Sequence, residues 1–111
     1  MRLLAHLSPW IYLVAAGVFE IGFTTFMKMS NGFQVWSYNV AFAACALLSF
    51  GFLNVSTRDL SLGTAYAVWT GIGAFGTAAI GMLVFEDPTT PWRVLFLTTL
   101  IGSIIGLRLV S

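Results

Sequence analysis

Glu20 is the only charged residue in an apolar run that extends from residue 9 to residue 27. An ionised carboxylate at the centre of a membrane helix costs about 2.5–3.5 kcal/mol on insertion scales, so such a group normally faces a partner or a water-filled cavity. Apolar surroundings also disfavour its charged form. We therefore expect Glu20 to hold either a proton or a cation. The alternative is a structural carboxylic acid that is hydrogen-bonded to a neighbouring helix.

Two further side chains lie on the same face as Glu20 if this run is helical. Phe23 and Thr24 follow it at spacings of three and four residues, and Ala16 and Gly17 precede it at the same spacings. Small residues, a hydroxyl and an aromatic ring suit the lining of a cavity better than a surface that contacts lipid. Phe23 and Thr24 therefore join Glu20 in the predicted site.

An aromatic pair and a lone serine are the other candidates for this site. Tyr66 and Trp69 are three residues apart and would share a helix face. Aromatic faces attract cations, and a tyrosine hydroxyl can hold a carboxylate in place. The alternative is a pair of aromatic residues at the membrane interface. Ser49 lies in another apolar run, where its hydroxyl could bond a backbone carbonyl or orient Glu20.

These residues must be positioned by membrane-spanning helices. The 111 residues are 59% hydrophobic and 8% charged, whereas a soluble domain carries about 25% charged residues. Each of the four apolar stretches can cross a hydrocarbon core of about 30 Å as a helix. We predict an all-α, multi-pass bundle that forms one transmembrane domain in the lipid bilayer. Its helices are expected approximately at residues 9–27, 35–55, 62–85 and 91–110.

Prolines and glycines add local detail to these helices. Pro9 and Pro91 suit the first turn of a helix, where a missing amide hydrogen costs little. Residues 71–76 match the glycine spacing of dinucleotide-binding loops, but no strand precedes them and they lie inside an apolar stretch. We expect Gly71 and Gly73 instead to allow a bend and a close helix contact.

Four helices leave little room for a pore within one chain, so we expect a dimer. Gly102 and Gly106 form a G-x-x-x-G pattern, which favours tight helix pairing. If both termini lie on one side, positive charges barely select an orientation, and copies inserted both ways would pair antiparallel. A fixed orientation is the alternative. The terminal side would hold Arg2, Arg58 and Arg108, and the other side Lys28 and Arg93.

Few other groups in the sequence are suited to catalysis. The single cysteine, Cys45, and the single histidine, His6, are too few for a metal cluster, and no second carboxylate lies inside an apolar stretch. We therefore expect no enzyme, cofactor or metal site. The net charge of +1 gives no basis for nucleic-acid binding.

These features together resemble the small multidrug resistance transporters over essentially the whole chain. The resemblance rests on four apolar stretches and a glycine-rich last helix. It also rests on residues 17–20 (GVFE), which end at Glu20, and on residues 27–33 (MKMSNGF) and 65–73 (AYAVWTGIG). It implies an antiparallel, dual-topology dimer in the bacterial inner (plasma) membrane that exchanges protons for small organic cations.

The same resemblance implies roles for particular residues. Glu20 of each subunit would bind both proton and substrate. Tyr66, Trp69 and Ser49 stand where the family has its site-lining tyrosine, tryptophan and serine. The last helix, with Gly102, would carry much of the contact between subunits.

Two branches of this family share features with the chain. Residues 17–20, 69–76 and 86–88 resemble the guanidinium exporters, but Phe23 stands where that branch has a tryptophan. Residues 21–22 and 24–28 resemble the exporters of quaternary ammonium and aromatic cations. We predict a proton-coupled antiporter that exports guanidinium-type cations. The alternatives are a broad-specificity multidrug exporter, one subunit of a heterodimer with a paralogue, and a non-transporting membrane assembly subunit.

Overall fold

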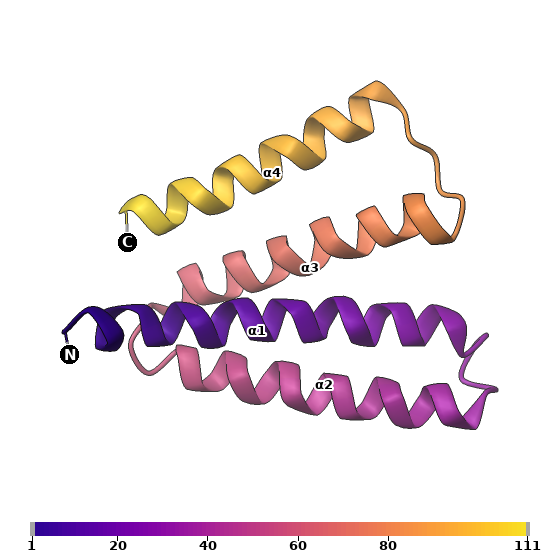
Figure 1. The fold of residues 1–111 in the computed structure, drawn as a ribbon, viewed down its shortest axis with the longest axis horizontal. Helices are drawn as coiled ribbons and strands as arrows, with labels where there is room; N and C mark the ends of the chain where they lie inside the picture. Colours follow the sequence, from indigo (N-terminus) through magenta and orange to yellow (C-terminus); the bar gives the residue numbers. More distant parts are fainter. Residues whose placement is uncertain (1, 111) are drawn as a thin grey trace.

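The computed structural model describes residues 2–110, and the side chains of residues 8–110. The side chains of Arg2 and His6 lie outside this part of the chain. Each of the four helices contains a stretch long and apolar enough to cross a membrane. The predicted all-α, multi-pass membrane architecture is therefore confirmed. The helices are α1 (Arg2–Met29), α2 (Trp36–Ser56), α3 (Leu62–Val84) and α4 (Pro91–Val110) (Figure 1).

The turns between helices are set by short polar segments. After α1, Asn31, Gly32 and Phe33 all have positive φ angles, of 53°, 74° and 66°. The buried Ser30 holds this turn, because its Oγ donates to the Met27 carbonyl at 2.7 Å and accepts from the Phe33 amide at 3.1 Å. Left-handed backbone conformations of this kind end a helix and reverse the chain.

The α2–α3 and α3–α4 connections use hydroxyl caps. Ser61 accepts from the Thr64 amide and so caps the start of α3. Thr90 plays the same part before α4, where its Oγ1 accepts from the Arg93 amide at 3.2 Å. Both caps satisfy amide groups that the first helical turn leaves unpaired.

The position of Pro9 differs from the sequence-based expectation. The first helix begins at Arg2, so Pro9 lies inside it and not in its first turn. Residues 2–7 (RLLAHL) are mostly strong helix formers, which explains why the helix extends back beyond the apolar run. Pro91 does begin α4.

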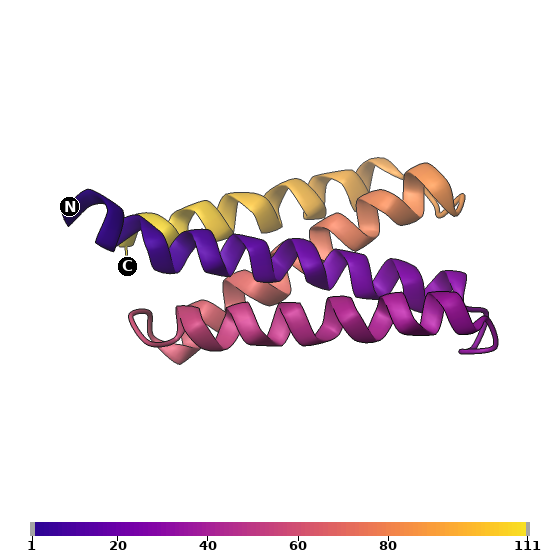
Figure 2. The ribbon, with the colours of Figure 1, turned by 60° about the horizontal axis from the view of Figure 1, so that its bottom comes forward.

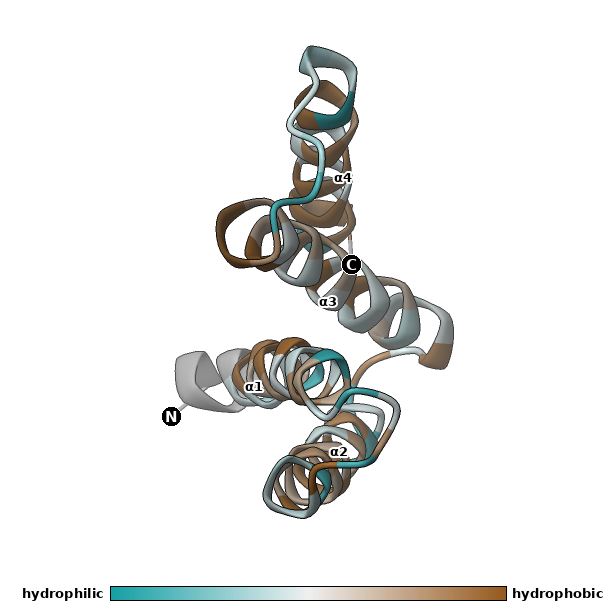
Figure 3. Ribbon diagram, turned by 90° about the vertical axis from the view of Figure 1, so that its right-hand side faces the viewer, coloured by the Kyte–Doolittle hydropathy of each residue, from teal (hydrophilic) through white to brown (hydrophobic). Residues whose placement is uncertain are grey.

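The helices form an open stack in which α1 has two neighbours. Helices α1 and α2 run antiparallel and side by side, and α3 packs against α1 (Figures 1 and 2). Among the described helices, α3 is the only one whose backbone comes close to that of α4. The end-on view in Figure 3 shows α4 on the side of α3 that faces away from α1. The two termini lie at the same end of the stack (Figures 1 and 2).

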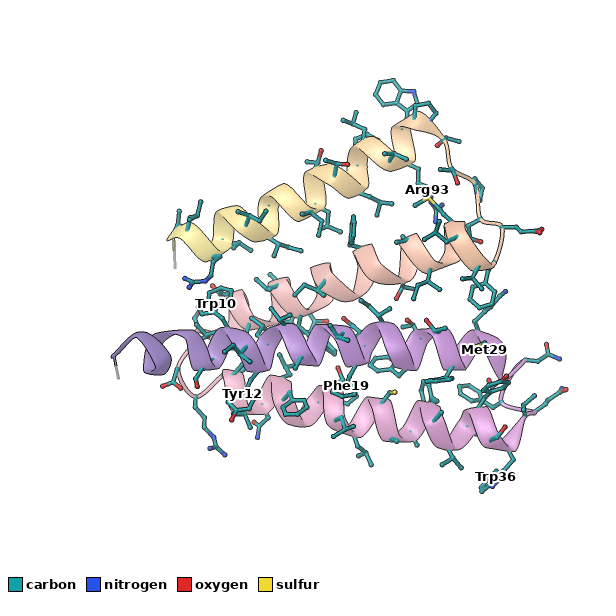
Figure 4. The ribbon with its side chains drawn as sticks, viewed as in Figure 1. Trp10, Tyr12, Phe19, Met29, Trp36 and Arg93 are labelled. Atoms are coloured by element: carbon teal, nitrogen blue, oxygen red, sulfur yellow. The ribbon has the colours of Figure 1, made fainter. Side chains whose placement is uncertain are left out.

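Helices α1 and α3 supply the buried core, and aromatic rings join α1 to α2. The Phe52 ring of α2 stacks on both Tyr12 and Phe19 of α1, with ring centroids 5.8 Å apart in each pair (Figure 4). These contacts fix how α1 is rotated relative to its neighbours. The buried hydrophobic residues are Trp10, Leu13 and Ala16 of α1 and Ala65, Val68 and Trp69 of α3.

Helix α4 is largely unpacked within the chain, since none of its described residues is buried. A Cβ added to Gly102 or Gly106 would meet nothing within 4 Å. The α4 side chain of Arg108 reaches back to α1, where its Cζ lies 4.8 Å from the ring centroid of Trp10 (Figure 4). The glycine face of α4 is thus open, and its predicted role in a dimer stays a prediction.

Candidate functional site

Glu20 lies at the contact between α1 and α3. A methyl group at Gly73 of α3 would overlap the Glu20 carboxyl group, so glycine is what allows the α3 backbone to lie against this carboxyl. Glu20 Oε1 is buried and has no hydrogen-bond partner among the described residues. The described residues show no hydrogen bond from this oxygen to another helix, and the role of Glu20 stays a prediction. One acceptor atom of Glu20 stands unused inside the protein.

A chain of hydrogen bonds links three helices one helical turn before Glu20 and Gly73. Trp69 Nε1 of α3 donates to Ser49 Oγ of α2 at 2.9 Å, and Ser49 Oγ donates to the Ala16 carbonyl of α1 at 2.6 Å. All three residues are buried. Ser49 therefore bonds a backbone carbonyl, and it also positions the Trp69 indole.

Trp69 differs in environment from the other tryptophans that lie near helix ends. Trp36 and Trp92 begin or nearly begin their helices and are largely exposed, as residues at a membrane interface are. Trp69 lies within α3, is 7% exposed and has its indole N–H satisfied by another helix. Its environment is that of an internal group and not of an interfacial one.

Trp69 is part of an aromatic surface that passes through three helices. Tyr66 lies 5.7 Å from Trp69 between ring centroids, and Phe50 of α2 lies 5.5 Å from Trp69 on another side. Phe50 in turn stacks at 6.1 Å on Phe23 of α1. Tyr66 is 57% exposed in the single chain, so this surface is open at its α3 end. We refer to Tyr66, Trp69, Phe50 and Phe23 as the aromatic surface.

Thr24 connects α1 to a residue that the sequence analysis did not single out. Its Oγ1 donates to the Ile21 carbonyl at 2.9 Å and lies 2.6 Å from Thr77 Oγ1 of α3. Thr77 follows Gly73 by four residues, and Gly73 follows Trp69 by four. This helical spacing was the signal in the sequence that could have identified Thr77.

The two predicted bend glycines are contact points in the structure. Gly71 is buried beneath the Ile104 side chain of α4, whose Cδ1 would lie 2.7 Å from an added Cβ. Gly73 faces Glu20 on another side of α3. Helix α3 runs without interruption from Leu62 to Val84. The bend expected at Gly71 and Gly73 stays a prediction. No group of three or more His, Cys, Asp or Glu residues that could hold a metal ion occurs within the described residues.

Comparison with known proteins decides the family. Residues 8–100 match the family model described as Small Multidrug Resistance protein. The chain belongs to the small multidrug resistance family. This agrees with the resemblance seen in residues 17–20, 27–33 and 65–73. As a family member, the chain is a membrane transporter and not an enzyme.

Similar members of the small multidrug resistance family cover nearly the whole chain. The chain is 39% identical over 102 residues to a guanidinium exporter of Proteus vulgaris, which covers 92% of this chain and 98% of that protein. A guanidinium exporter of Citrobacter freundii is 39% identical over 100 residues, covering 90% and 95%. One from Salmonella typhimurium strain LT2 is 36% identical over 100 residues, with the same two shares of 90% and 95%.

Proposed function

We propose that this chain exports small guanidinium-type cations across the bacterial inner membrane in exchange for protons. The observation that carries the proposal is the buried Glu20 Oε1, which has no hydrogen-bond partner among the described residues. The Glu20 carboxyl lies against Gly73, one helical turn after the fixed Trp69 on α3. The guanidinium exporters to which the chain is similar support the choice of cation.

The chemistry of a guanidinium ion matches these groups. It is planar and donates parallel hydrogen bonds, which a carboxylate accepts in pairs. An unused carboxylate oxygen on Glu20 is the acceptor that such an ion requires. Its flat face also suits stacking on the rings of the aromatic surface, where the π electrons attract positive charge.

Exchange follows if one carboxyl serves both ligands. Glu20 cannot hold a proton and accept hydrogen bonds from a cation as a carboxylate simultaneously, so loading one expels the other. Each unit of pH difference across the membrane supplies about 1.4 kcal/mol per proton. Transport then alternates access to a site near the bilayer midplane, as in other secondary transporters.

The working unit in this proposal is an antiparallel dimer in which both copies contribute Glu20. The unpacked face of α4, with Gly102 and Gly106, supports a helix-pairing role there. If the two copies are identical and antiparallel, the inward-open and outward-open states are the same structure seen from opposite sides. A heterodimer with a paralogue would lack this symmetry.

A second candidate function is favoured by the aromatic surface. A quaternary ammonium ion has no N–H to donate, so it would depend on the charge of Glu20 and on aromatic faces alone. Phe23, Phe50 and Trp69 present such faces together. Export of quaternary ammonium and aromatic cations is therefore the competing assignment. The non-transporting assembly subunit is disfavoured, because the chain belongs to a family of transporters.

The test is transport by purified protein in liposomes. Glu20→Gln keeps the shape of the side chain but cannot release a proton, so guanidinium uptake driven by a pH difference should be lost while assembly is retained. Glu86→Gln is the matched control, because Glu86 is exposed and lies in the loop after α3. Uptake that persists in Glu20→Gln, or that is lost equally in Glu86→Gln, would contradict the proposal.

The choice of cation is tested on the same liposomes. Guanidinium, phenylguanidinium and tetrapropylammonium are compared at equal pH difference, with protein expressed alone and with a paralogue if the genome encodes one. Transport of the first two and not of the third supports the guanidinium assignment. Transport of all three supports the multidrug assignment, and transport only with the paralogue supports a heterodimer.

A further inference from the structure

The interface between α1 and α3 ends in a pocket. The two helices run parallel, and their contacts advance together along both of them toward the α3–α4 loop. An added Cβ at Gly17, Gly73 or Gly76 would overlap a side chain across this interface. Beyond the last of these contacts the helices separate. The successive pairs are Gly17 with Ile72, Glu20 with Gly73, Ile21 with Gly76, and Thr24 with Thr77.

The pocket begins where the threonine pair ends this interface. It has a volume of about 300 Å³ and is lined by Thr24 and Thr77, while its other lining residues follow them on α1, on α3 and in the α3–α4 loop. Glu20 and Gly73 do not line it, although each is only one helical turn from a threonine of the pair. The threonine pair and the contact of Ile21 with Gly76 therefore lie between the pocket and the Glu20 carboxyl, and the threonine pair is the one next to the pocket.

The pocket is chemically suited to a small organic cation. Its lining includes three threonines, Phe85 and the acidic residue Asp87. Lys28 also lines it, so the formal charges of the lining residues cancel. Asp87 has a cationic neighbour in Arg93, whose Nη2 is 3.9 Å from Asp87 Oδ2 (Figure 4).

The direction of the threonine hydrogen bond follows from the proton count. Thr24 has one hydroxyl proton, which its Oγ1 donates to the Ile21 carbonyl at 2.9 Å. In the 2.6 Å contact between the two hydroxyls, Thr77 must then be the donor and Thr24 the acceptor. Among the described residues this is the only hydrogen bond that joins α1 to α3 directly.

We propose that the Thr24–Thr77 hydrogen bond is a gate between this pocket, which is the entry chamber for the cation, and Glu20. Thr77 is then a positioning residue whose hydroxyl proton keeps α1 and α3 together at the chamber's inner end. The proposal rests on cation transport through Glu20, as proposed above, and adds the route to it.

Guanidinium is suited to opening such a gate. When the threonine pair parts, the N–H groups of guanidinium can donate to the Thr24 oxygen in place of the Thr77 hydroxyl. A quaternary ammonium ion donates nothing and would leave that oxygen without a donor. When no cation is present, water reaches Glu20 from the chamber only if the Thr24–Thr77 hydrogen bond breaks and no other donor replaces it. The gate thus favours hydrogen-bonding cations and suppresses proton leak.

The test is Thr77→Val, which keeps the side chain's shape and removes its hydroxyl. In liposomes of purified protein we expect proton leak without cation to rise about threefold or more, because one interhelical hydrogen bond is lost. The transport-rate ratio of guanidinium to tetramethylammonium should fall by a similar factor. The guanidinium dissociation constant at Glu20 should change less than about twofold, since Thr77 does not touch the bound cation.

Thr57→Val is the matched control. Thr57 lies at the C-terminal end of α2 and does not line the chamber, and its hydroxyl donates at 2.7 Å to the Asn54 carbonyl of α2. It should leave leak and selectivity near wild type. Thr77→Ser restores the hydroxyl without the methyl group and should restore both, which a packing role would not predict. If Thr77→Val does not fold, Thr77→Ser and Thr24→Val are compared in its place.

Three results would overturn the gate. Thr77→Val could match Thr57→Val in leak and selectivity, it could change only the dissociation constant, or Thr77→Ser could fail to restore the wild-type values. Failure of the underlying function is separate, because it would show as absence of guanidinium transport in the wild-type protein itself.

Discussion

Gly73 of α3 lies directly against the carboxyl group of Glu20 of α1, so closely that a single methyl group at Gly73 would overlap it. Among the described residues, Glu20 is the only acidic residue inside a membrane span, and its carboxyl group lies against the α3 backbone at a position with no side chain. Gly63 lies on the same helix, where an added Cβ would meet nothing within 4 Å. The two glycines therefore allow the contact to be separated from general effects of glycine in a helix.

Gly73→Ala should lower guanidinium transport by about tenfold or more, because displacing a binding group by about 1 Å has effects of this size or larger. Alanine is favoured over glycine in helices by up to about 1 kcal/mol, so loss of helix propensity cannot be the cause. Gly63→Ala gains the same propensity and should transport normally. Uptake in liposomes measures both variants, and equal uptake by the two would show that the Glu20–Gly73 contact has no role in transport.

Ser49→Ala should destabilise the protein by about 1–3 kcal/mol, because it removes two interhelical hydrogen bonds and leaves the buried Trp69 N–H unpaired. Ser56 is the control: it is also buried in α2, but its Oγ donates to the Leu53 carbonyl of its own helix at 2.7 Å. Ser56→Ala should cost less than about 1 kcal/mol. Denaturant unfolding in mild detergent compares them, and equal losses would mean that the interhelical bonds contribute nothing extra.

Arg108→Gln should lower stability by about 0.5–2 kcal/mol through loss of the cation–π contact with Trp10. Arg58→Gln removes a charge from the same membrane side, since both residues lie at the end of the stack that holds the termini. The Arg58 side chain is exposed. Thermal unfolding of the two variants separates the contact from the charge. A stability loss shared equally by both would point to charge alone.

Guanidinium affinity should fall as the pH falls. In the range where one proton and one cation compete for Glu20, each unit of decrease in pH should weaken the apparent affinity about tenfold. At higher pH the carboxyl is fully ionised and affinity should reach a plateau. Calorimetric titration over a pH series measures this. An affinity that stays constant across the series, or a pH dependence that remains in Glu20→Gln, would rule out competition at this carboxyl.

The membrane fold could be read from the sequence because its signal is strong and local. Four long apolar stretches require four helices, since backbone polar groups in lipid must be satisfied within the segment. Glu20 was equally easy to choose as a candidate site residue, because a lone carboxylate in hydrocarbon is costly. The start of the first helix was missed, because Pro9 suggested a beginning while the residues before it are also helix formers.

The contacts within the site could not be read in the same way. They depend on how each helix is rotated and shifted relative to its neighbours, and helices that are apolar on every side give little information on rotation. The sequence therefore left two possible partners for the Ser49 hydroxyl, and the positions of α1 and α3 decide between them. Thr77 was missed because its importance comes from the parallel register that sets it opposite Thr24, 53 residues earlier.

The attachment of α4 has a mechanical consequence. Near its C-terminal end this helix is held to other helices by Arg108 on Trp10 and by Ile104 over Gly71. At its other end, Arg93 contacts Asp87 of the preceding loop, and the exposed Trp92 stacks on Phe96 of the same helix. Trp92 and Arg108 are ~24 Å apart along the helix, so a tilt of about 10° about the Arg108 end would move Trp92 by ~4 Å. A small change in tilt near the chain termini would therefore produce its largest displacement at the opposite membrane surface.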